Sequence, residues 1–313
     1  MTNLVLTFHN IQDGAWFEKT LHLIGRFYTY GTLDQLYARL SGEKKSLNRM
    51  CFLTFDDGER SVYDVIFPIL QRLSIPAAMF VSPLNIREGG AFWFQRMRQL
   101  QLQEIETLKN LPLADICKHI DVLDPSSATN GDLNIDIPMF EVLRKSGLVT
   151  FGAHTQHHPV LSNESDDTSH KEIHDSIMDL ERLLGTRVRY FAYPNGGKND
   201  FSNREINTLK QCGIDMAFST IPGYATDQDM YAVRRIGLTC GNSMHIVLKL
   251  LFPQMFVKIR KWRDCLRGRT LYEQLHAVEN SSAGDKKRIT ENGMFFVAEY
   301  ANISAENVEL YNY

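Results

Sequence analysis

The stretch CFLTFDDGER, residues 51–60, places two neighbouring carboxylates, Asp56 and Asp57, directly after an apolar run. Two adjacent anions at the end of a buried segment repel each other and are costly to desolvate. A nearby cation would relieve this repulsion, because it favours the ionised form of both groups. The stretch therefore predicts a buried strand that ends at a charged site.

Short runs with strand character alternate with helical patterns on both sides of this stretch. The helical patterns include residues 62–73, where apolar side chains have the spacing of one helix face, and residues 170–185, which end at Gly185. Further strands are predicted at residues 4–10, 76–83, 147–155, 188–197, 215–220 and 231–238. This alternation indicates an α/β fold with a mostly parallel sheet, either closed as a barrel or open and doubly wound.

The polar residues that follow the predicted strands favour the barrel. Asp56 and Asp57, then His154, then the turn at residues 193–197 each stand at the carboxyl end of a strand. Parallel α/β folds build their sites at this end of the sheet, and the loops of a barrel converge there on one pocket.

Two segments interrupt the alternation and set the expected organisation. Residues 86–146 combine an amphipathic helical pattern with a polar stretch, so we expect an insertion there within a barrel of residues 1–240. Residues 241–313 are expected to form a C-terminal extension packed on the barrel. Its basic run at 258–269 fits a solvated helix face or a helix at a membrane surface.

Composition restricts the class of protein. The chain has 313 residues, 43% of them hydrophobic, and a formal charge of −3, which offers no argument for nucleic acid binding. Its five cysteines are scattered, as expected of reduced thiols. The sequence has no recognisable signal peptide and no apolar stretch approaching ~18 residues. A cytoplasmic protein is expected, with peripheral membrane contact through 258–269 as an option.

The stretch GAHTQHHP, residues 152–159, supplies candidate metal ligands. His154 and His158 are four residues apart, so a helical turn would bring both to one ion. Two imidazoles and one carboxylate form a familiar set for a divalent ion with open positions. One of the two adjacent carboxylates would then be a ligand and the other would remain able to accept a proton.

Three motifs together resemble the polysaccharide deacetylase family, carbohydrate esterase family 4 or the NodB-homology domain. They are TFDDG at 54–58, HTQHH at 154–158 and FAYPNGG at 191–197, and the resemblance covers roughly residues 4–240. It implies a distorted (β/α)7-type barrel that removes N-acetyl, sometimes O-acetyl, groups from sugars with a divalent metal ion. Zinc is the first expectation, with cobalt or nickel as alternatives.

The resemblance also implies roles for individual residues. Asp56 would be the general base, and the metal ligands would be Asp57, His154 and His158. The third motif has Ala192 where many members have an arginine that orients the base. An arginine from a later strand, Arg234 or preferably Arg235, would replace it. The backbone N–H of Asn195 would stabilise the oxyanion in place of a more usual tyrosine.

The late histidine that serves many members as general acid is not recognisable. His9, at the end of the first strand, is expected to take this part, as in members with rotated motif order, and His245 is its rival. Tyr193 in the third motif and Trp93 in the insertion are predicted to contact the substrate. Core packing is an equal alternative for Trp93.

The expected activity is metal-dependent hydrolysis of the N-acetyl group of an acetamido sugar. The substrate would be a nucleotide-linked or lipid-linked sugar or a glycan, as used in surface polysaccharide or lipopolysaccharide assembly. One alternative is another amide hydrolase on the same scaffold, which the intact set of metal ligands opposes. The other is a catalytically silent barrel that binds a glycan or a partner, which Asp56 opposes and Ala192 mildly favours.

Overall fold

The computed structural model describes residues 3–44, 48–101, 105–123, 133–226, 230–239, 241 and 243–252. The chain divides into two compact units, Met1–Gln254 and Met255–Tyr313, and only the first contains described residues. The basic run at 258–269 therefore lies outside the described residues, and its role stays a prediction. Among the described residues, no helix has the length and apolar character needed to span a membrane.

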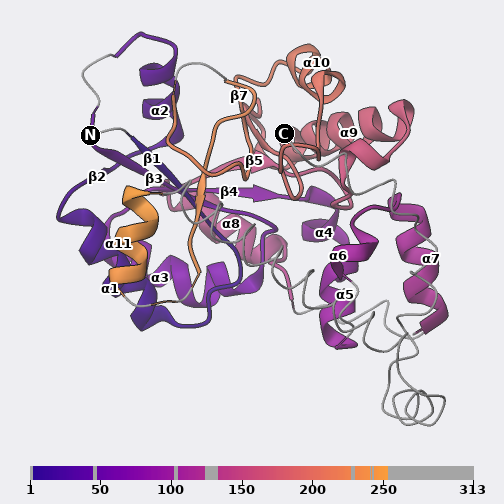
Figure 1. Ribbon diagram of the computed structural model, residues 1–313, viewed down its shortest axis with the longest axis horizontal. Coiled ribbons are helices and arrows are strands. Elements are labelled where there is room, and N and C mark those ends of the chain that lie inside the picture. Colours follow the sequence, from indigo (N-terminus) through magenta and orange to yellow (C-terminus); the bar gives the residue numbers. More distant parts are fainter. Residues whose placement is uncertain are drawn as a thin grey trace, which may run out of the picture. The chain divides into compact units, whose positions relative to one another are not determined.

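One parallel sheet organises the first unit (Figure 1). Its strand order is β7-β6-β5-β4-β3-β1-β8, with β2 paired beside β3, and each of these pairings is parallel. The strands are β1 Leu4–Phe8, β2 Thr29–Tyr30, β3 Met50–Phe55, β4 Ala77–Val81, β5 Val149–Ala153, β6 Tyr190–Ala192, β7 Met216–Phe218 and β8 Ile236–Gly237.

The segment of residues 230–238 joins the two ends of this sheet. Val233 forms a parallel bridge with Phe218 of β7, and Ile236 pairs with Leu6 of β1. The sheet thus curls into a distorted barrel, and the predicted (β/α)7-type fold is confirmed. Arg235 stands between the two pairings, on the segment that closes the barrel.

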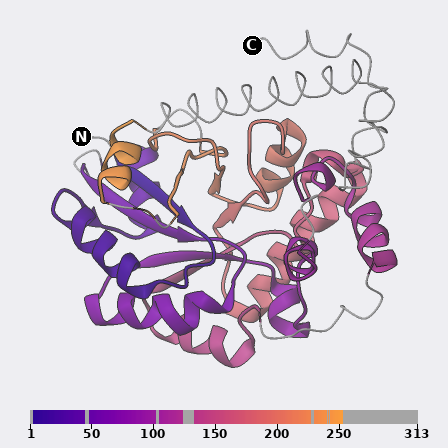
Figure 2. The same ribbon diagram turned by 60° about the horizontal axis from the view of Figure 1, so that its bottom comes forward.

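The helices lie around the sheet (Figures 1 and 2). In Figure 1, α1, α3 and α8 lie below the sheet and α5, α6 and α7 form a group to its right; in Figure 2 the strands lie above a row of helices. The helices are α1 Gly14–Gly25, α2 Leu33–Leu40, α3 Phe67–Leu73, α4 Pro83–Glu88, α5 Trp93–Gln99, α6 Ile105–Leu108, α7 Leu113–Leu123, α8 Ile137–Lys145, α9 Asp166–Leu184, α10 Asn203–Gln211 and α11 Ser243–Leu251.

Helix ends follow the expected local chemistry. α9 ends at Gly185, which adopts the left-handed conformation with φ 70°. α10 begins with a capping box in which Ser202 and Glu205 each bond the other's backbone. Glu205 is fully buried and also accepts hydrogen bonds from Ser169 and Arg204. Burial raises the pKa of Glu205, but these hydrogen bonds outweigh burial and lower it.

Alternation along β3 separates two apolar layers. Cys51, Leu53 and Phe55 belong to the larger cluster, which includes residues of α1 and α3, whereas Phe52 belongs to a second cluster with residues of α2. Because side chains alternate along a strand, Asp56 continues the face of Phe52. The strand that the sequence predicts therefore delivers its first carboxylate to the inside of the barrel.

The helical insertion has its own small core but is shorter than predicted. Residues of α5, α6 and α7 form a separate apolar cluster, which is Phe92, Trp93, Phe94, Met97, Leu108, Ile116 and Ile120. Residues 86–146 also include α8, which contacts β5 and α4 and so belongs to the strand–helix alternation of the barrel. Of residues 241–313, the structure describes Gly241 and residues 243–252. These include α11, which contacts α1.

Candidate active site

Asp56 and Arg235 form a buried ion pair inside the barrel. The guanidinium donates from Nη1 to Asp56 Oδ1 and from Nη2 to Oδ2, each at 2.7 Å, and the Arg235 side chain is 0% exposed. Arg235 also donates to the Ser219 carbonyl at 2.9 Å and to Thr54 Oγ1 at 3.1 Å. Its neighbour Arg234 is exposed, so Arg235 is the arginine that contacts Asp56.

The surroundings of Asp56 keep it ionised. Burial raises its pKa, but the charge of Arg235, with contributions from His154 and His9, outweighs burial and lowers it. The Thr7 hydroxyl donates to Asp56 Oδ2 at 3.3 Å. His9 Nε2 lies 3.9 Å from the same oxygen, and the His9 side chain is 51% exposed. A fixed carboxylate thus faces a partly solvated imidazole.

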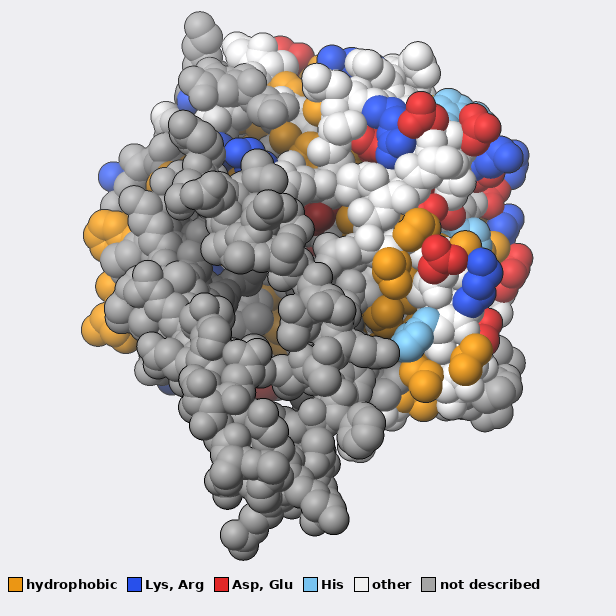
Figure 3. Space-filling view, turned by 45° about the vertical axis from the view of Figure 1, so that its right-hand side comes forward, with side chains coloured by type: hydrophobic (Ala, Val, Ile, Leu, Met, Phe, Trp, Pro, Cys, Tyr) orange, Lys and Arg blue, Asp and Glu red, His pale blue; other side chains and the backbone are white. Residues whose placement is uncertain are grey.

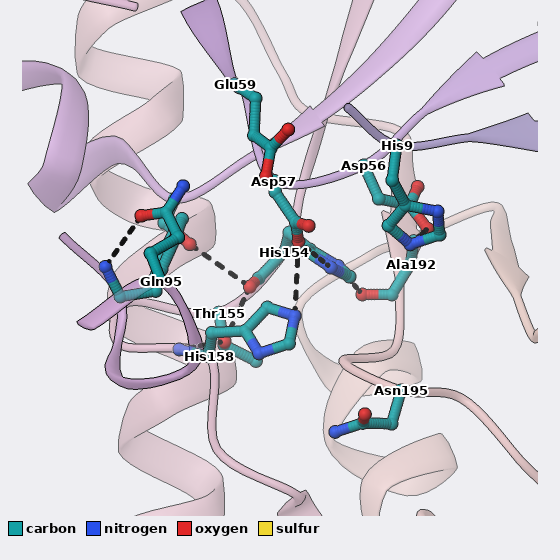
Figure 4. A network of polar contacts seen from close by, with 12 residues as sticks. His9, Asp56, Asp57, Glu59, Gln95, His154, Thr155, His158, Ala192 and Asn195 are labelled. Carbon is teal, nitrogen blue, oxygen red and sulfur yellow. Dashed lines mark hydrogen bonds and ion pairs between the residues drawn. The ribbon is translucent and has the colours of Figure 1, made fainter. Parts of the chain in front are cut away.

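Asp57, His154 and His158 gather next to Asp56 (Figure 4). Asp57 Oδ1 lies 3.4 Å from His154 Nε2 and 3.2 Å from His158 Nε2, and all three residues are buried. Among the described residues this is the group whose ligand atoms could hold one metal ion, and these atoms lie within 4.8 Å of one another.

The polar contacts of this trio suit a cation. His154 Nδ1 donates to the Ala192 carbonyl at 2.7 Å, so Nε2 is the ring nitrogen that faces Asp57. Asp57 Oδ1 is buried without a hydrogen-bond partner. Burial lowers the pKa of His158, which favours the neutral imidazole that a metal requires. The donor set therefore fits a divalent ion.

Two members of the trio and two neighbouring residues adopt unusual backbone conformations. Asp57, Thr155, His158 and Asn195 have φ values of 72°, 65°, 60° and 56°, in the left-handed region that non-glycine residues rarely occupy. Such conformations persist only where surrounding contacts enforce them, and they cluster at functional sites.

Contacts within the histidine loop enforce its shape. The Thr155 hydroxyl accepts a hydrogen bond from the His158 backbone N–H at 3.1 Å. Glu172 of α9 accepts from the backbone N–H groups of Gln156 and His157, both at 3.0 Å, and also contacts the His157 ring. His157 is thus bound to α9 and is not a member of the trio.

Asn195 sits in a turn at the end of β6. The Thr220 hydroxyl donates to the Asn195 carbonyl, and the Thr220 backbone N–H donates to the Gly196 carbonyl at 2.8 Å. The side-chain amide nitrogen of Asn195 is buried and has no hydrogen-bond partner. The turn therefore holds a donor without a partner, and Asn195 lines the same cavity as the trio drawn with it in Figure 4.

A cavity of about 400 Å³ joins these groups. The barrel motifs provide one part of its wall and the insertion provides the rest. It is lined by His9, Asp56, Asp57, Trp93, Phe94, Arg98, Ile105, Lys109, His154, His158, Asn195 and Thr220. The strand ends therefore converge on one pocket, as expected for a barrel.

The insertion is attached directly to the trio. The Trp93 indole N–H donates to the His158 carbonyl at 3.0 Å, and the Phe94 ring lies 4.8 Å from the His158 ring. Near the other motif, Glu59 forms an antiparallel bridge with Asn134. The insertion thus contacts His158 directly and, through Asn134, the chain two residues after Asp57.

The two residues predicted to contact substrate lie in different surroundings. The Tyr193 side chain is fully buried, stacks on Phe201 at 3.9 Å and donates to the Tyr231 carbonyl. It does not line the cavity, so the predicted substrate contact of its side chain is wrong for this arrangement. Trp93 lines the cavity, but it is buried and its N–H is used by His158.

Three further residues at the site were not predicted from the sequence. Glu59 is buried two positions after Asp57, and burial, together with the Asp57 charge, raises its pKa to about 7. Arg98 and Lys109 line the cavity from α5 and from the end of α6. Only the position of Glu59, next to TFDDG, gave a signal in the sequence, because the insertion carries no motif. The rival general acid His245 is exposed on α11 and does not line the cavity.

Comparison with known proteins agrees with the geometry. The model of the family "Polysaccharide deacetylase" matches residues 43–217, more than half of the chain. The protein YxkH of Bacillus subtilis is 22% identical over 250 residues, which cover 76% of this chain and 72% of YxkH. The poly-beta-1,6-N-acetyl-D-glucosamine N-deacetylase of Staphylococcus epidermidis is 24% identical over 202 residues, 64% of this chain and 58% of that protein.

Solved structures share the fold. The Streptococcus pyogenes deacetylase PplD has a TM-score of 0.58 and 18% identity, covering 80% of this chain and 96% of its own. IcaB from Ammonifex degensii has a TM-score of 0.57 and 19% identity, covering 76% and 92%. The predicted enzyme class, a hydrolase of the deacetylase type, is confirmed by the family match. The three predicted motifs lie inside the matched residues, and the chain belongs to the polysaccharide deacetylase family, carbohydrate esterase family 4.

Proposed function

We propose that this protein is a metal-dependent deacetylase that hydrolyses the N-acetyl group of an acetamido sugar in a glycan or glycan precursor. The observation that carries the proposal is the pair of adjacent carboxylates in different environments. Asp56 is bound by Arg235 through two hydrogen bonds, whereas Asp57 faces two imidazole nitrogens. One carboxylate is thus held for proton transfer and the other for a cation.

Asp57, His154 and His158 would hold the metal, with zinc as the first candidate and cobalt or nickel as alternatives. A divalent ion with open positions acidifies water and polarises the acetyl carbonyl when it is bound. The Ala192 carbonyl fixes the tautomer of His154, and the Thr155 hydroxyl holds the backbone of His158. These contacts orient the donor atoms before the ion arrives.

Asp56 is proposed as the general base. Its low pKa keeps it ionised at neutral pH, so it can accept the proton of the attacking water. Arg235 fixes both carboxylate oxygens, and Thr7 reaches Oδ2 as well. Arg235 therefore takes the orienting part that an arginine in place of Ala192 would have.

His9 and Asn195 complete the proposed set. His9 lines the cavity 3.9 Å from Asp56, so it can donate a proton to the leaving amine, which is a poor leaving group without one. Its rival His245 does not line the cavity. The Asn195 turn would stabilise the tetrahedral oxyanion through its backbone N–H, and its unpartnered side-chain amide adds a second donor.

A substrate in surface polysaccharide or lipopolysaccharide assembly is proposed from the relatives. One matching protein is named for N-deacetylation of poly-beta-1,6-N-acetyl-D-glucosamine, and the solved structure of PplD holds acetate, the product expected here. The cavity of about 400 Å³ suits one sugar ring with its acetamido group.

Acetate release tests the proposal. Purified protein is stripped of metal, reloaded with zinc, cobalt or nickel, and incubated with acetamido sugars and their oligomers. We expect metal-dependent acetate release, its abolition in Asp56→Asn with metal binding retained, and loss of both metal and activity in His154→Ala. Asp64→Asn, on the exposed surface, serves as control.

Other outcomes separate the alternatives. Bound metal with hydrolysis of a formamide or cyclic amide, but of no acetamido sugar, would indicate a different amide hydrolase. Glycan binding without any turnover would indicate a silent barrel. Full activity of Asp56→Asn would overturn the assignment of the base.

A further inference from the structure

The histidine loop, residues 154–158, carries a proposed metal ligand at each end. His154 directly continues β5, and the His158 carbonyl accepts a hydrogen bond from Trp93 of the insertion. The middle of the loop, residues 156 and 157, belongs neither to the trio nor to the lining of the cavity. Whatever holds this middle part therefore determines how the two ligands lie relative to each other.

Glu172 of α9 binds the middle of the loop with both of its carboxylate oxygens. Oε2 accepts from the backbone N–H groups of Gln156 and His157, both at 3.0 Å, and Oε1 lies 2.7 Å from Nδ1 of the His157 ring. Glu172 is only 8% exposed. Hydrogen bonds to a carboxylate are stronger than those to a neutral acceptor. One buried side chain thus fixes two consecutive peptide groups between the ligands.

Asp179, seven positions further along α9, supports the same part of the loop. It accepts a hydrogen bond from the side-chain amide of Gln156 at 2.8 Å. Residues seven apart lie on one face of a helix, so Glu172 and Asp179 both face the loop from α9. Arg87 of α4 and Arg182 of α9 bind Asp179 in turn. The 19-residue helix α9 therefore offers the loop a fixed support.

The conformation that these contacts hold is unfavourable by itself. Thr155 and His158 flank the middle of the loop, and their φ values of 65° and 60° lie in the left-handed region. A non-glycine residue keeps such a conformation only where its surroundings enforce it. Without the contacts of Glu172 the loop would relax, and the His158 ring would no longer be held beside His154.

The surroundings of Glu172 differ from those of carboxylates at the surface. On the face shown in Figure 3, exposed Asp and Glu side chains lie beside Lys and Arg side chains, where water screens their attraction. Glu172 is buried, and among the described residues its hydrogen bonds go to the middle of the histidine loop. This arrangement favours a role in the shape of the loop over a general effect of surface charge.

We propose that Glu172 is a positioning residue of the metal site. It holds the peptide groups of residues 156 and 157 so that His154 and His158 present their Nε2 atoms to one ion. The inference rests on the proposed function and deepens it. Groups that orient metal ligands typically change metal affinity by about 10–100-fold when they are replaced. The metal affinity of this protein is then set in part by α9, a helix outside the trio.

Metal binding to the full chain tests this role. Calorimetry gives the zinc affinity, and the visible absorption spectrum of bound cobalt at saturation reports the geometry of its ligands. Glu172→Ala removes both acceptor oxygens, so it should weaken zinc binding by at least about tenfold and change the cobalt spectrum. Glu172→Gln keeps the shape of the side chain and one acceptor oxygen, so it should recover most of the lost affinity.

Glu181→Ala is the matched control. Glu181 is also a carboxylate of α9, and it accepts from the backbone N–H of Val188 at 3.0 Å, away from the histidine loop. Its loss should leave the zinc affinity and the cobalt spectrum unchanged. Equal weakening in Glu181→Ala and Glu172→Ala would show a general effect of α9 and would overturn the positioning role. Wild-type affinity and spectrum in Glu172→Ala would overturn it as well.

A second variant decides the result if Glu172→Ala does not fold. Glu172→Asp keeps the charge but withdraws the carboxylate by one methylene group, so zinc binding should again be weaker and the cobalt spectrum changed. Wild-type values in Glu172→Asp would then overturn the proposal. Acetate release is measured separately. A wild type that binds zinc but releases no acetate would overturn the deacetylase proposal alone, whereas one that binds neither zinc nor cobalt would overturn both.

Discussion

Replacing Arg235 by methionine should destabilise the protein strongly. Asp56 would keep its charge inside the barrel but lose both 2.7 Å hydrogen bonds, and the Ser219 carbonyl would lose its donor. Removing one partner of a buried ion pair typically costs about 3–5 kcal/mol, because the other charge stays buried without compensation. We expect a loss of this size in the free energy of unfolding.

Urea unfolding at pH 7 measures this loss in four proteins: wild type, Arg235→Met, Asp56→Asn and the double variant. In the double variant no carboxylate charge is left unpaired, so its loss should fall short of the sum of the single losses by at least ~1 kcal/mol. Arg234→Met is the matched control, because Arg234 is the exposed neighbour, and it should change stability by at most about 0.5 kcal/mol.

A loss below about 1 kcal/mol in Arg235→Met would show that the Asp56–Arg235 ion pair does not stabilise the fold as inferred, since removal of a buried, hydrogen-bonded guanidinium should cost more. Additive losses in the double variant would do the same. In that case the two side chains would not be coupled, and the orienting role proposed for Arg235 would have no physical basis.

Three further measurements test other parts of the site. Free zinc at 1,000 times its Kd should raise the free energy of unfolding by about 4 kcal/mol, and chelation of the zinc should remove this gain. Asp57→Asn should lose most of the response. Trp93→Phe keeps an aromatic side chain but removes the donor to the His158 carbonyl, so calorimetry should show zinc affinity reduced about tenfold. The advantage of wild type over Glu205→Gln in unfolding free energy should be full above the pKa of an unfolded glutamate, about 4.3, and should disappear as the pH falls through the lower folded pKa. An advantage that grew toward acidic pH would contradict the hydrogen bonding of Glu205 with Arg204.

The central site was predictable from the sequence because its residues follow strands. Asp56 and Asp57 continue β3, and His154 continues β5, so parallel pairing alone brings them to one end of the barrel. The sequence alone does not separate Arg235 from Arg234. It depends on the inward and outward alternation of a short irregular segment, which the structure resolves through contact with Asp56.

The wall built by the insertion was not predictable in the same way. Arg98 and Lys109 reach the cavity only because α5, α6 and α7 share a small core and are bound to Asn134 and Asn163. Such contacts between irregular segments leave no periodic pattern in the sequence. The predicted substrate contact of Tyr193 was wrong for the opposite reason. Tyr193 lies in a motif, but side-chain alternation along β6 turns its ring into the apolar core.

The closing segment of residues 230–238 has a consequence for how activity arises during folding. Asp56 and its guanidinium partner are 179 positions apart in the chain, and contacts of such separation carry a high cost of loop closure. A chain that ends before residue 235 would contain all three family motifs yet lack both the partner of Asp56 and the joint between β7 and β1. Turnover therefore requires that the whole barrel has closed. A nascent or truncated chain would contain the three motifs and would be inactive.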